Sequence, residues 1–163
     1  MRLLSACGQI DGHRFTQSLA ILEYLNDTRG LALVPQDPAQ AAHVRALAQS
    51  IAIDLHPICN LRVAKHAASL TPENADAIPD WMAHFIAPGL DAFEKLLGKF
   101  TQMPFCQGVK PGLADICLMP QLYNAHRWGV DLAPFRRLTD IETNCLALPA
   151  FAAARPEAQP DAD

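Results

Sequence analysis

Apolar positions along the chain follow two periods, a short alternating one near the N-terminus and a helical one almost everywhere else. Residues 4–15 hold two short apolar stretches on either side of Asp11-Gly12, a dipeptide that suits the positive φ angles of a tight hairpin turn. The pattern then becomes helical until Asn26 and Gly30 break it. We therefore predict one β-hairpin and one helix, a piece too small to form a domain unless it packs on something else or on a missing piece of chain.

The chain after Val34 predicts only helices. Asp37-Pro38 combines a good N-cap with the residue best tolerated at the first helical position. A long helix is predicted from there to about Ala68, with a bend at Pro57, because proline removes one backbone hydrogen bond. Residues next to such a bend can point into a cleft.

Three more helices are predicted, at about 79–99, 113–126 and 134–145, before a short turn at 149–153. The helix at 113–126 is apolar on nearly all sides, which is typical of a central, buried helix. Pro88-Gly89 is expected to kink the helix around it. The Pro- and acid-rich residues 155–163 are expected to be disordered.

Composition and charge narrow the possible partners. Half of the 163 residues are apolar or aromatic, which is enough for the core of one ordinary domain. The formal charge is -4 and no Lys/Arg block stands out, which speaks against nucleic acid as a partner. No apolar run approaches the roughly 20 residues of a membrane span, and the N-terminus turns polar too soon for a secretory signal. We therefore predict a cytoplasmic protein without a membrane partner.

Metal, redox and common hydrolase motifs receive no support. The cysteines are odd in number and include no C-x-x-C pair, which favours reduced core residues over a disulfide frame, a zinc site or a redox centre. Six histidines with no second acid or thiol at ligand spacing predict no metal site. The chain contains no paired carboxylates, G-x-S-x-G, P-loop or G-x-G-x-x-G. The five cysteines are Cys7, Cys59, Cys106, Cys117 and Cys145.

Thr16-Gln17-Ser18 stands at the start of the first predicted helix. Unpaired backbone amides and the positive end of the helix dipole make such a place a ready anion site, so a carboxylate would bind there. The simpler interpretation is that Ser18 or Thr16 only caps the helix, and spacing alone favours it.

Polar side chains at two further positions along the chain could bind a ligand. His56 and Asn60 are four residues apart and would share a helix face, with Arg62 about half a turn beyond, so that they could hold a polar ligand. Equally, His56 could cap the kink while Asn60 and Arg62 are solvated or make interdomain contacts. Arg127 follows the buried helix, where a cation is favoured by the dipole. It could instead pair with a substrate carboxylate, although capping is the simpler interpretation.

Longer stretches are more specific than these spacings. They are DGHRFTQSLAILEYL (11–25), DLHP (54–57), NLRV (60–63), LADICL (113–118), PQLYNA (120–125), Arg127, VDL (130–132), LPAF (148–151) and PEAQPD (156–161). Together they resemble the zeta-class glutathione transferases, the family of maleylacetoacetate and maleylpyruvate isomerases. The resemblance implies a mainly α fold. An all-helical C-terminal domain at 37–154 follows a partial thioredoxin-like piece at 1–30, a β-hairpin plus helix that is the remnant of the glutathione-binding domain.

The resemblance also implies a role for each matched site. Gln17 and Ser18 look like the pair that holds the γ-glutamyl end of the cofactor glutathione. The residues that look like the lining of the glutathione and substrate cleft are His56, Asn60, Leu61 and Arg62. Arg127 looks like the residue that grips a carboxylate of a dicarboxylic substrate, with Arg62 as a second.

The implied reaction is the cis–trans isomerisation of a maleyl diketo acid, of the maleylacetoacetate to fumarylacetoacetate type, in tyrosine and phenylalanine or other aromatic-compound catabolism. The glutathione thiolate adds to the cis double bond, the resulting single bond rotates, and elimination returns the trans isomer. A homodimer is implied as well. Two other functions stay open: a non-catalytic binding or dimerisation module, and a general glutathione transferase.

The chain departs from the family pattern in three places. The family begins with a β-α-β segment carrying a Ser-rich motif that stabilises the thiolate, and nothing in this chain corresponds to it. We therefore expect impaired activity, because an unassisted thiol is mostly protonated at pH 7, and we expect Met1 to be a misassigned or frameshifted start. Ser5-Ala6 stands where a cis-proline is usual. Gly112 stands where Ser or Thr usually caps the buried helix with Asp115 as its partner.

Overall fold

The hairpin predicted around Asp11-Gly12 is present in the computed structural model, which describes residues 7–160. Strand β1 (Cys7–Ile10) pairs antiparallel with β2 (His13–Thr16), and the turn residues have φ angles of 53° and 78°. Helix α1 (Ser18–Arg29) follows and ends at Gly30, which has a left-handed φ of 62°. These elements confirm the predicted hairpin and helix within residues 7–30. Ser5-Ala6, which stands where the family usually has a cis-proline, lies outside the described residues.

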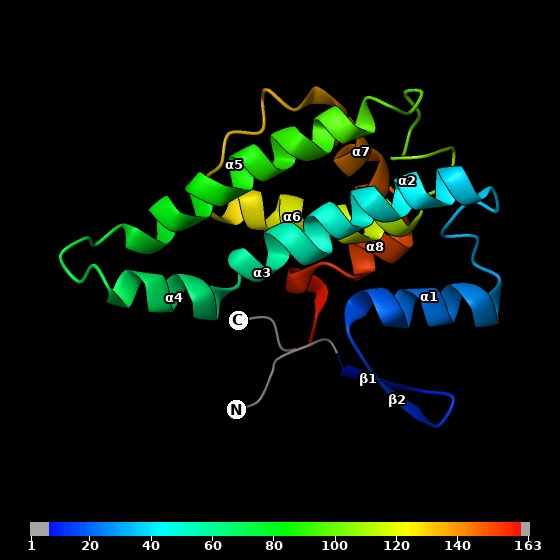
Figure 1. Ribbon diagram of the computed structural model, residues 1–163, viewed down its shortest axis with the longest axis horizontal. Coiled ribbons are helices and arrows are strands. Elements are labelled where there is room, and N and C mark those ends of the chain that lie inside the picture. Colours follow the sequence, from blue (N-terminus) through cyan, green and yellow to red (C-terminus); the bar gives the residue numbers. More distant parts are fainter. Residues whose placement is uncertain (1–6, 161–163) are drawn as a thin grey trace.

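Side chains of α1 hold the hairpin and the helical domain together. The Asp11 carboxylate accepts hydrogen bonds from Arg29 at 2.6 Å and from the Tyr24 hydroxyl at 2.9 Å. The Arg29 guanidinium holds the pKa of Asp11 below its usual value. On the other side of α1, Glu23 pairs with Arg45 at 2.8 Å. Figure 1 shows α1 and the hairpin below the helical domain, on the same side of it.

The long helix predicted to run to Ala68 is broken. It consists of α2 (Pro38–Gln49), the π-helix η1 (Ser50–Leu55) and the short α3 (His56–Ile58), and α4 (Leu61–Ser69) begins as a separate helix. Asn60 has an extended backbone with ψ 131°, and its side-chain oxygen accepts the Arg62 N–H at 3.0 Å. The prediction of one bent helix was wrong because Asn60 acts as an N-cap and starts a new helix.

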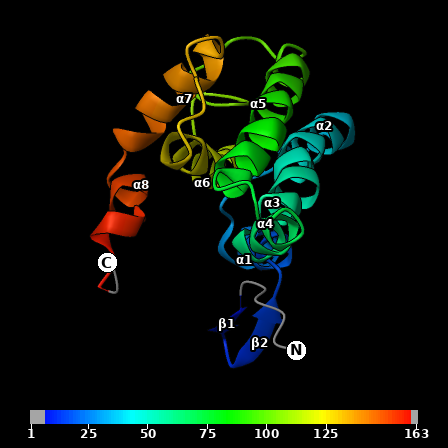
Figure 2. The same cartoon turned by 90° about the vertical axis from the view of Figure 1, so that its left-hand side faces the viewer.

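The remaining helices agree with the predicted positions. They are α5 (Ala77–Leu97), α6 (Leu113–Arg127), α7 (Arg136–Leu146) and α8 (Pro149–Ala153). Eight residues of α6 are buried, and Figures 1 and 2 show this helix in the middle of the others, as its apolar sequence predicted. Helix α5 continues through Pro88 and Gly89. Residues 156–158, expected to be disordered, form a 3₁₀ turn, η2 (Pro156–Ala158), and residues 161–163 lie outside the described range.

A buried carboxylate fixes the start of α6. Asp115 is fully buried, and its two oxygens accept the N–H groups of Cys106 and Gly112, each at 2.8 Å. Gly112 supplies no side chain to this cap. A Cβ atom there would lie 2.4 Å from the Gln107 amide nitrogen and 2.9 Å from the Leu33 carbonyl oxygen. Gln107 itself donates to that carbonyl at 3.1 Å, so its side chain fills the space that a capping hydroxyl would need.

Gly112→Ser is therefore expected to destabilise the protein although it restores the usual capping residue. We expect the free energy of unfolding to fall by about 1–2 kcal/mol, because the Leu33 backbone cannot move away easily. Urea unfolding measures the change. Gln107→Ala in the same background should recover part of the loss, and a Gly112→Ser variant more stable than the wild type would contradict this view of the cap.

Candidate functional site

Gln17 connects the hairpin to α1 through a strained backbone. It occupies the N-cap position of the helix with φ 72° and ψ 121°, and no side chain caps the helix there. Ser18 is already the first residue of the helix, so the simpler interpretation, a capping role for Ser18 or Thr16, does not hold. A non-glycine residue with positive φ costs about 1–3 kcal/mol and such strain gathers at functional sites. The strain therefore favours the anion-site interpretation.

We expect Gln17→Gly to separate stability from binding. Glycine accepts a positive φ, so the free energy of unfolding should stay within about 1 kcal/mol of the wild type or rise. The glutathione dissociation constant should increase about fivefold, since a side-chain hydrogen bond of about 1 kcal/mol is lost. Calorimetric titration and urea unfolding provide the two values. Gln9→Gly in β1, where φ is ordinary, is the matched control and should lower stability without changing binding.

The break between α3 and α4 changes the predicted arrangement of His56, Asn60 and Arg62. His56 and Asn60 belong to different sides of the break, so they do not share one helix face as their spacing suggested. Burial lowers the pKa of His56, which keeps its ring neutral at pH 7. The side chains of Asn60, Leu61 and Arg62 are exposed, with Leu61 39% accessible. These three therefore lie on the surface, directly after the break.

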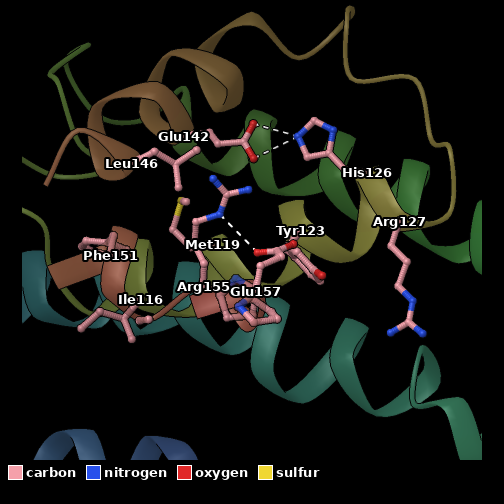
Figure 3. Close-up of a pocket in the computed structure, with 13 residues that line it drawn as sticks. Ile116, Met119, Tyr123, His126, Arg127, Glu142, Leu146, Phe151, Arg155 and Glu157 are labelled. Atoms are coloured by element: carbon pink, nitrogen blue, oxygen red, sulfur yellow. Dashed lines mark hydrogen bonds and ion pairs between the residues drawn. The ribbon is translucent and has the colours of Figure 1, made fainter. Parts of the chain in front are cut away.

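Arg127 is the last residue of α6, and within residues 7–160 its guanidinium has no carboxylate partner. It forms no ion pair with any residue between 7 and 160, and its guanidinium carbon lies over the ring of Trp128, 5.8 Å from the ring centroid. Figure 3 shows its side chain extending away from the pair formed by His126 and Glu142. A planar, unpaired guanidinium is suited to bidentate binding of a carboxylate.

Arg127 also lines a pocket of about 750 Å³ between α6, α7, α8 and η2. The apolar part of its wall comes from Ile116, Met119, Leu146 and Phe151 (Figure 3). The sequence-predicted residues Gln17, Ser18, His56, Asn60, Leu61 and Arg62 do not line this pocket. In Figure 2, α1 lies below α3 and α4, and the ion pair between Glu23 and Arg45 joins α1 to α2.

The rim of the pocket is a set of paired polar side chains that sequence reasoning missed. The His126 ring nitrogen lies 3.0 Å from both carboxylate oxygens of Glu142. A hydrogen bond with Glu157 raises the pKa of Tyr123, and Arg155 lies 3.4 Å from the same carboxylate. The partners come from α6, α7 and the C-terminal turn, far apart in the sequence. No spacing signal along the chain could have joined them.

Other reactive chemistry has little support in the described part of the chain. Burial raises the pKa of Cys59 and Cys117 to about 11 and that of Cys145 to about 12, so these thiols stay protonated at pH 7. Between residues 7 and 160, no group of three or more His, Cys, Asp or Glu side chains is arranged to hold a metal ion. No helix in the same range is long and apolar enough to cross a membrane.

The chain is similar to several characterised isomerases. It is 46% identical over 149 residues to a maleylacetoacetate isomerase of Rhizobium meliloti, a match that covers 91% of this chain and 70% of that protein. The crystal structure of a maleylpyruvate isomerase from Pseudomonas aeruginosa superposes with a TM-score of 0.90 at 42% identity, covering 96% of this chain and 83% of that one. No protein-family model matches the chain.

A third similar protein has been seen with ligands. The maleylacetoacetate isomerase of Anaeromyxobacter dehalogenans superposes with a TM-score of 0.87 at 39% identity, covering 94% of this chain and 71% of that one. One of its structures has glutathione bound in the active site, and another has dicarboxyethyl glutathione and citrate bound there.

Proposed function

The chain belongs to the maleylacetoacetate isomerase family of zeta-class glutathione transferases, and from this membership we propose that it isomerises maleylacetoacetate to fumarylacetoacetate with glutathione as its cofactor. The function is enzymatic, and the active site of a similar isomerase has glutathione bound in its crystal structure. Each residue of the proposed site has a separate role.

The start of α1 fits the γ-glutamyl end of glutathione. The strained backbone at Gln17 delivers the first N–H groups of a twelve-residue helix to one place, and no side chain at the N-cap competes for them. A carboxylate there gains hydrogen bonds from backbone amides and the favourable end of the helix dipole. We assign this contact to Gln17 and Ser18, and the wall beside it to His56, Asn60 and Leu61.

Arg127 is assigned to a carboxylate of a dicarboxylic substrate. The observation that carries this assignment is its exposed guanidinium, which makes no ion pair within residues 7–160 and stands at the end of a rigid, buried helix. Arg62 is the second cation, because it is exposed and its backbone is fixed by Asn60. Two cations would hold both ends of a dicarboxylate while the bond between them turns.

The chemistry divides between cofactor and protein. Bound glutathione supplies a thiolate that adds reversibly to the cis double bond of the substrate. Gln17 and Ser18 orient the cofactor, and the two arginines orient the substrate and stabilise its negative charge. The neutral ring of His56 can donate or accept one hydrogen bond without adding a charge.

The experiment that tests this function follows the isomerisation of maleylacetone with and without glutathione. We expect a rate that depends on glutathione, with the glutathione recovered unchanged. The dependence of the rate on glutathione is the criterion. Consumption of glutathione with an aromatic electrophile or a chlorinated acid, and none of the isomerisation, would favour a general transferase. No glutathione dependence of any reaction would favour a binding module.

Three finer proposals rest on the family alone. We propose that the natural substrate is a dicarboxylic maleyl acid of tyrosine and phenylalanine catabolism, that the protein is a homodimer, and that it works in the cytoplasm. Sedimentation equilibrium tests the second proposal, since a monomer at micromolar concentration would contradict it.

A further inference from the structure

We propose that Trp81 is a positioning residue for this site: its indole holds the break between α3 and α4 open and so fixes the place of Asn60, Leu61 and Arg62. Trp81 belongs to the first turns of α5, and it does not reach the ligand in this proposal. The inference deepens the proposed function and depends on it only for its effect on binding.

The hydrogen bonds around the break carry the inference. In an uninterrupted α-helix, the Ile58 carbonyl would accept the N–H of Arg62, four residues later. Here the Arg62 N–H is taken by the side-chain oxygen of Asn60 at 3.0 Å. The freed Ile58 carbonyl accepts the indole N–H of Trp81 at 2.9 Å. Two hydrogen bonds to side chains thus replace one backbone hydrogen bond. The Trp81 indole satisfies the carbonyl before the break, and the Asn60 side chain satisfies the N–H after it.

Trp81 is well placed for this role because its ring is held from a different helix. It packs against Phe85 with the ring centroids 4.8 Å apart, and it contacts the hydrophobic core from a partly buried position. Helices α4 and α5 pack along each other after the turn that joins them, so α5 supplies a rigid support. The donor therefore comes from a different helix than the carbonyl that it caps.

The alternative to the break is a continuous helix from α3 into α4. If the indole donor is lost, the Ile58 carbonyl loses its hydrogen-bond partner. The ordinary helical hydrogen bond with the Arg62 N–H would then satisfy it. That pairing would rotate Asn60 and Arg62 out of their present positions. Trp81 therefore acts on the site through the Ile58 carbonyl, by disfavouring the continuous helix.

Trp81→Phe tests the proposal because it keeps an aromatic ring and removes the donor. The matched control is Phe85→Leu, which weakens the same aromatic contact but leaves the indole and its hydrogen bond. We expect Trp81→Phe to raise the glutathione dissociation constant about tenfold, and Phe85→Leu to leave it within about twofold. Replacement of Trp81 by benzothienylalanine, which has sulfur in place of the N–H and nearly the same shape, should behave like Trp81→Phe.

Hydrogen exchange gives a second readout that needs no glutathione. In Trp81→Phe, the amides of Arg62, Val63 and Ala64 should change their exchange rates severalfold, while in Phe85→Leu any change should be spread along α5. Asn60→Ala already releases the break, so adding Trp81→Phe to it should have a smaller effect than in the wild type.

The two readouts separate the two hypotheses. If the wild type does not bind glutathione, the proposed function fails, and the exchange pattern still decides the role of Trp81. If Trp81→Phe and the benzothienylalanine protein leave the exchange of 62–64 unchanged, or if Phe85→Leu changes it equally, the positioning role is wrong.

Discussion

Replacement of Asp115 by alanine is expected to lower the free energy of unfolding by about 3–4 kcal/mol, because two buried N–H groups lose their acceptor at a cost of about 1–3 kcal/mol each. Both bonds are 2.8 Å long and join the loop before α6 to the start of that helix. Since α6 is the most deeply buried helix, the loss affects the whole domain. Urea unfolding monitored by circular dichroism gives the value. A total stability of about 5–15 kcal/mol is usual, so this is a large fraction.

Two variants make the measurement specific. Asp140→Ala, an exposed residue of α7, should change stability by less than about 0.5 kcal/mol. Asp115→Asn keeps one acceptor and should fall between the wild type and Asp115→Ala. An Asp115→Ala protein within about 1 kcal/mol of the wild type would contradict this view of the cap, since even one unsatisfied buried donor costs that much.

The pH dependence of stability gives an independent check on Asp115. Burial raises the pKa of this carboxyl in the folded protein above its ordinary value of 3.8. Between the two pKa values the folded state binds more protons than the unfolded state, so the unfolding free energy falls as pH rises through this window. The contribution is fully present below the unfolded pKa and is lost above the raised one. Asp115→Asn should remove this part of the pH dependence.

The second large effect is expected at Arg127. Arg127→Met should lower kcat/KM for a maleyl diketo acid about a hundredfold, because charge-assisted hydrogen bonds of about 1.5–3 kcal/mol each are lost. Arg127→Lys should lose about tenfold, since an ammonium group cannot bind a carboxylate with the same two-pronged geometry. Glutathione binding should change little in either variant, because we place the cofactor at α1.

Arg136→Met on the exposed face of α7 is the control, since that arginine also forms no ion pair within the described range. It should retain the wild-type kcat/KM. Equal losses in the Arg127 and Arg136 variants would show a general charge effect in place of a specific contact. The same variants titrated with malonate separate substrate binding from the chemical step.

The sequence predicted those elements whose signals are local. Asp11-Gly12 suits a turn with two positive φ angles, and both occur. Asp37-Pro38 predicted the start of α2, where the Asp37 side chain accepts the Gln40 N–H at 2.8 Å. The apolar run around 113–126 predicted the buried α6. In each case the residues that decide the structure are neighbours in the chain.

The sequence did not predict local structures that depend on contacts with residues far away in the chain. The helical period of 44–59 gives no sign of the break that follows it, where Asn60 caps a new helix and Trp81, 23 residues away, donates to the Ile58 carbonyl. Gly112 stands in place of the usual Ser or Thr cap, and the sequence does not show that Gln107 fills the space beside it. The strain at Gln17 cannot be read from residue types, because glutamine usually avoids positive φ.

The candidate site was predicted mainly through the family resemblance. Residue types alone left Gln17, His56 and Arg127 divided between ligand binding and capping. In the structure no side chain caps the helix at Gln17, and Arg127 has no carboxylate partner within residues 7–160, so ligand binding at both stays a prediction. For Asn60 it shows the capping role directly.

The central claim is that the start of α1, the break after α3 and Arg127 serve one cleft. Its most direct test is a crystal structure of this chain with glutathione and malonate. We predict the γ-glutamyl carboxylate on the backbone amides at Gln17 and Ser18, and malonate on Arg127 within reach of the glutathione sulfur. Glutathione and malonate bound on separate faces of the molecule, or malonate bound far from Arg127, would contradict the claim.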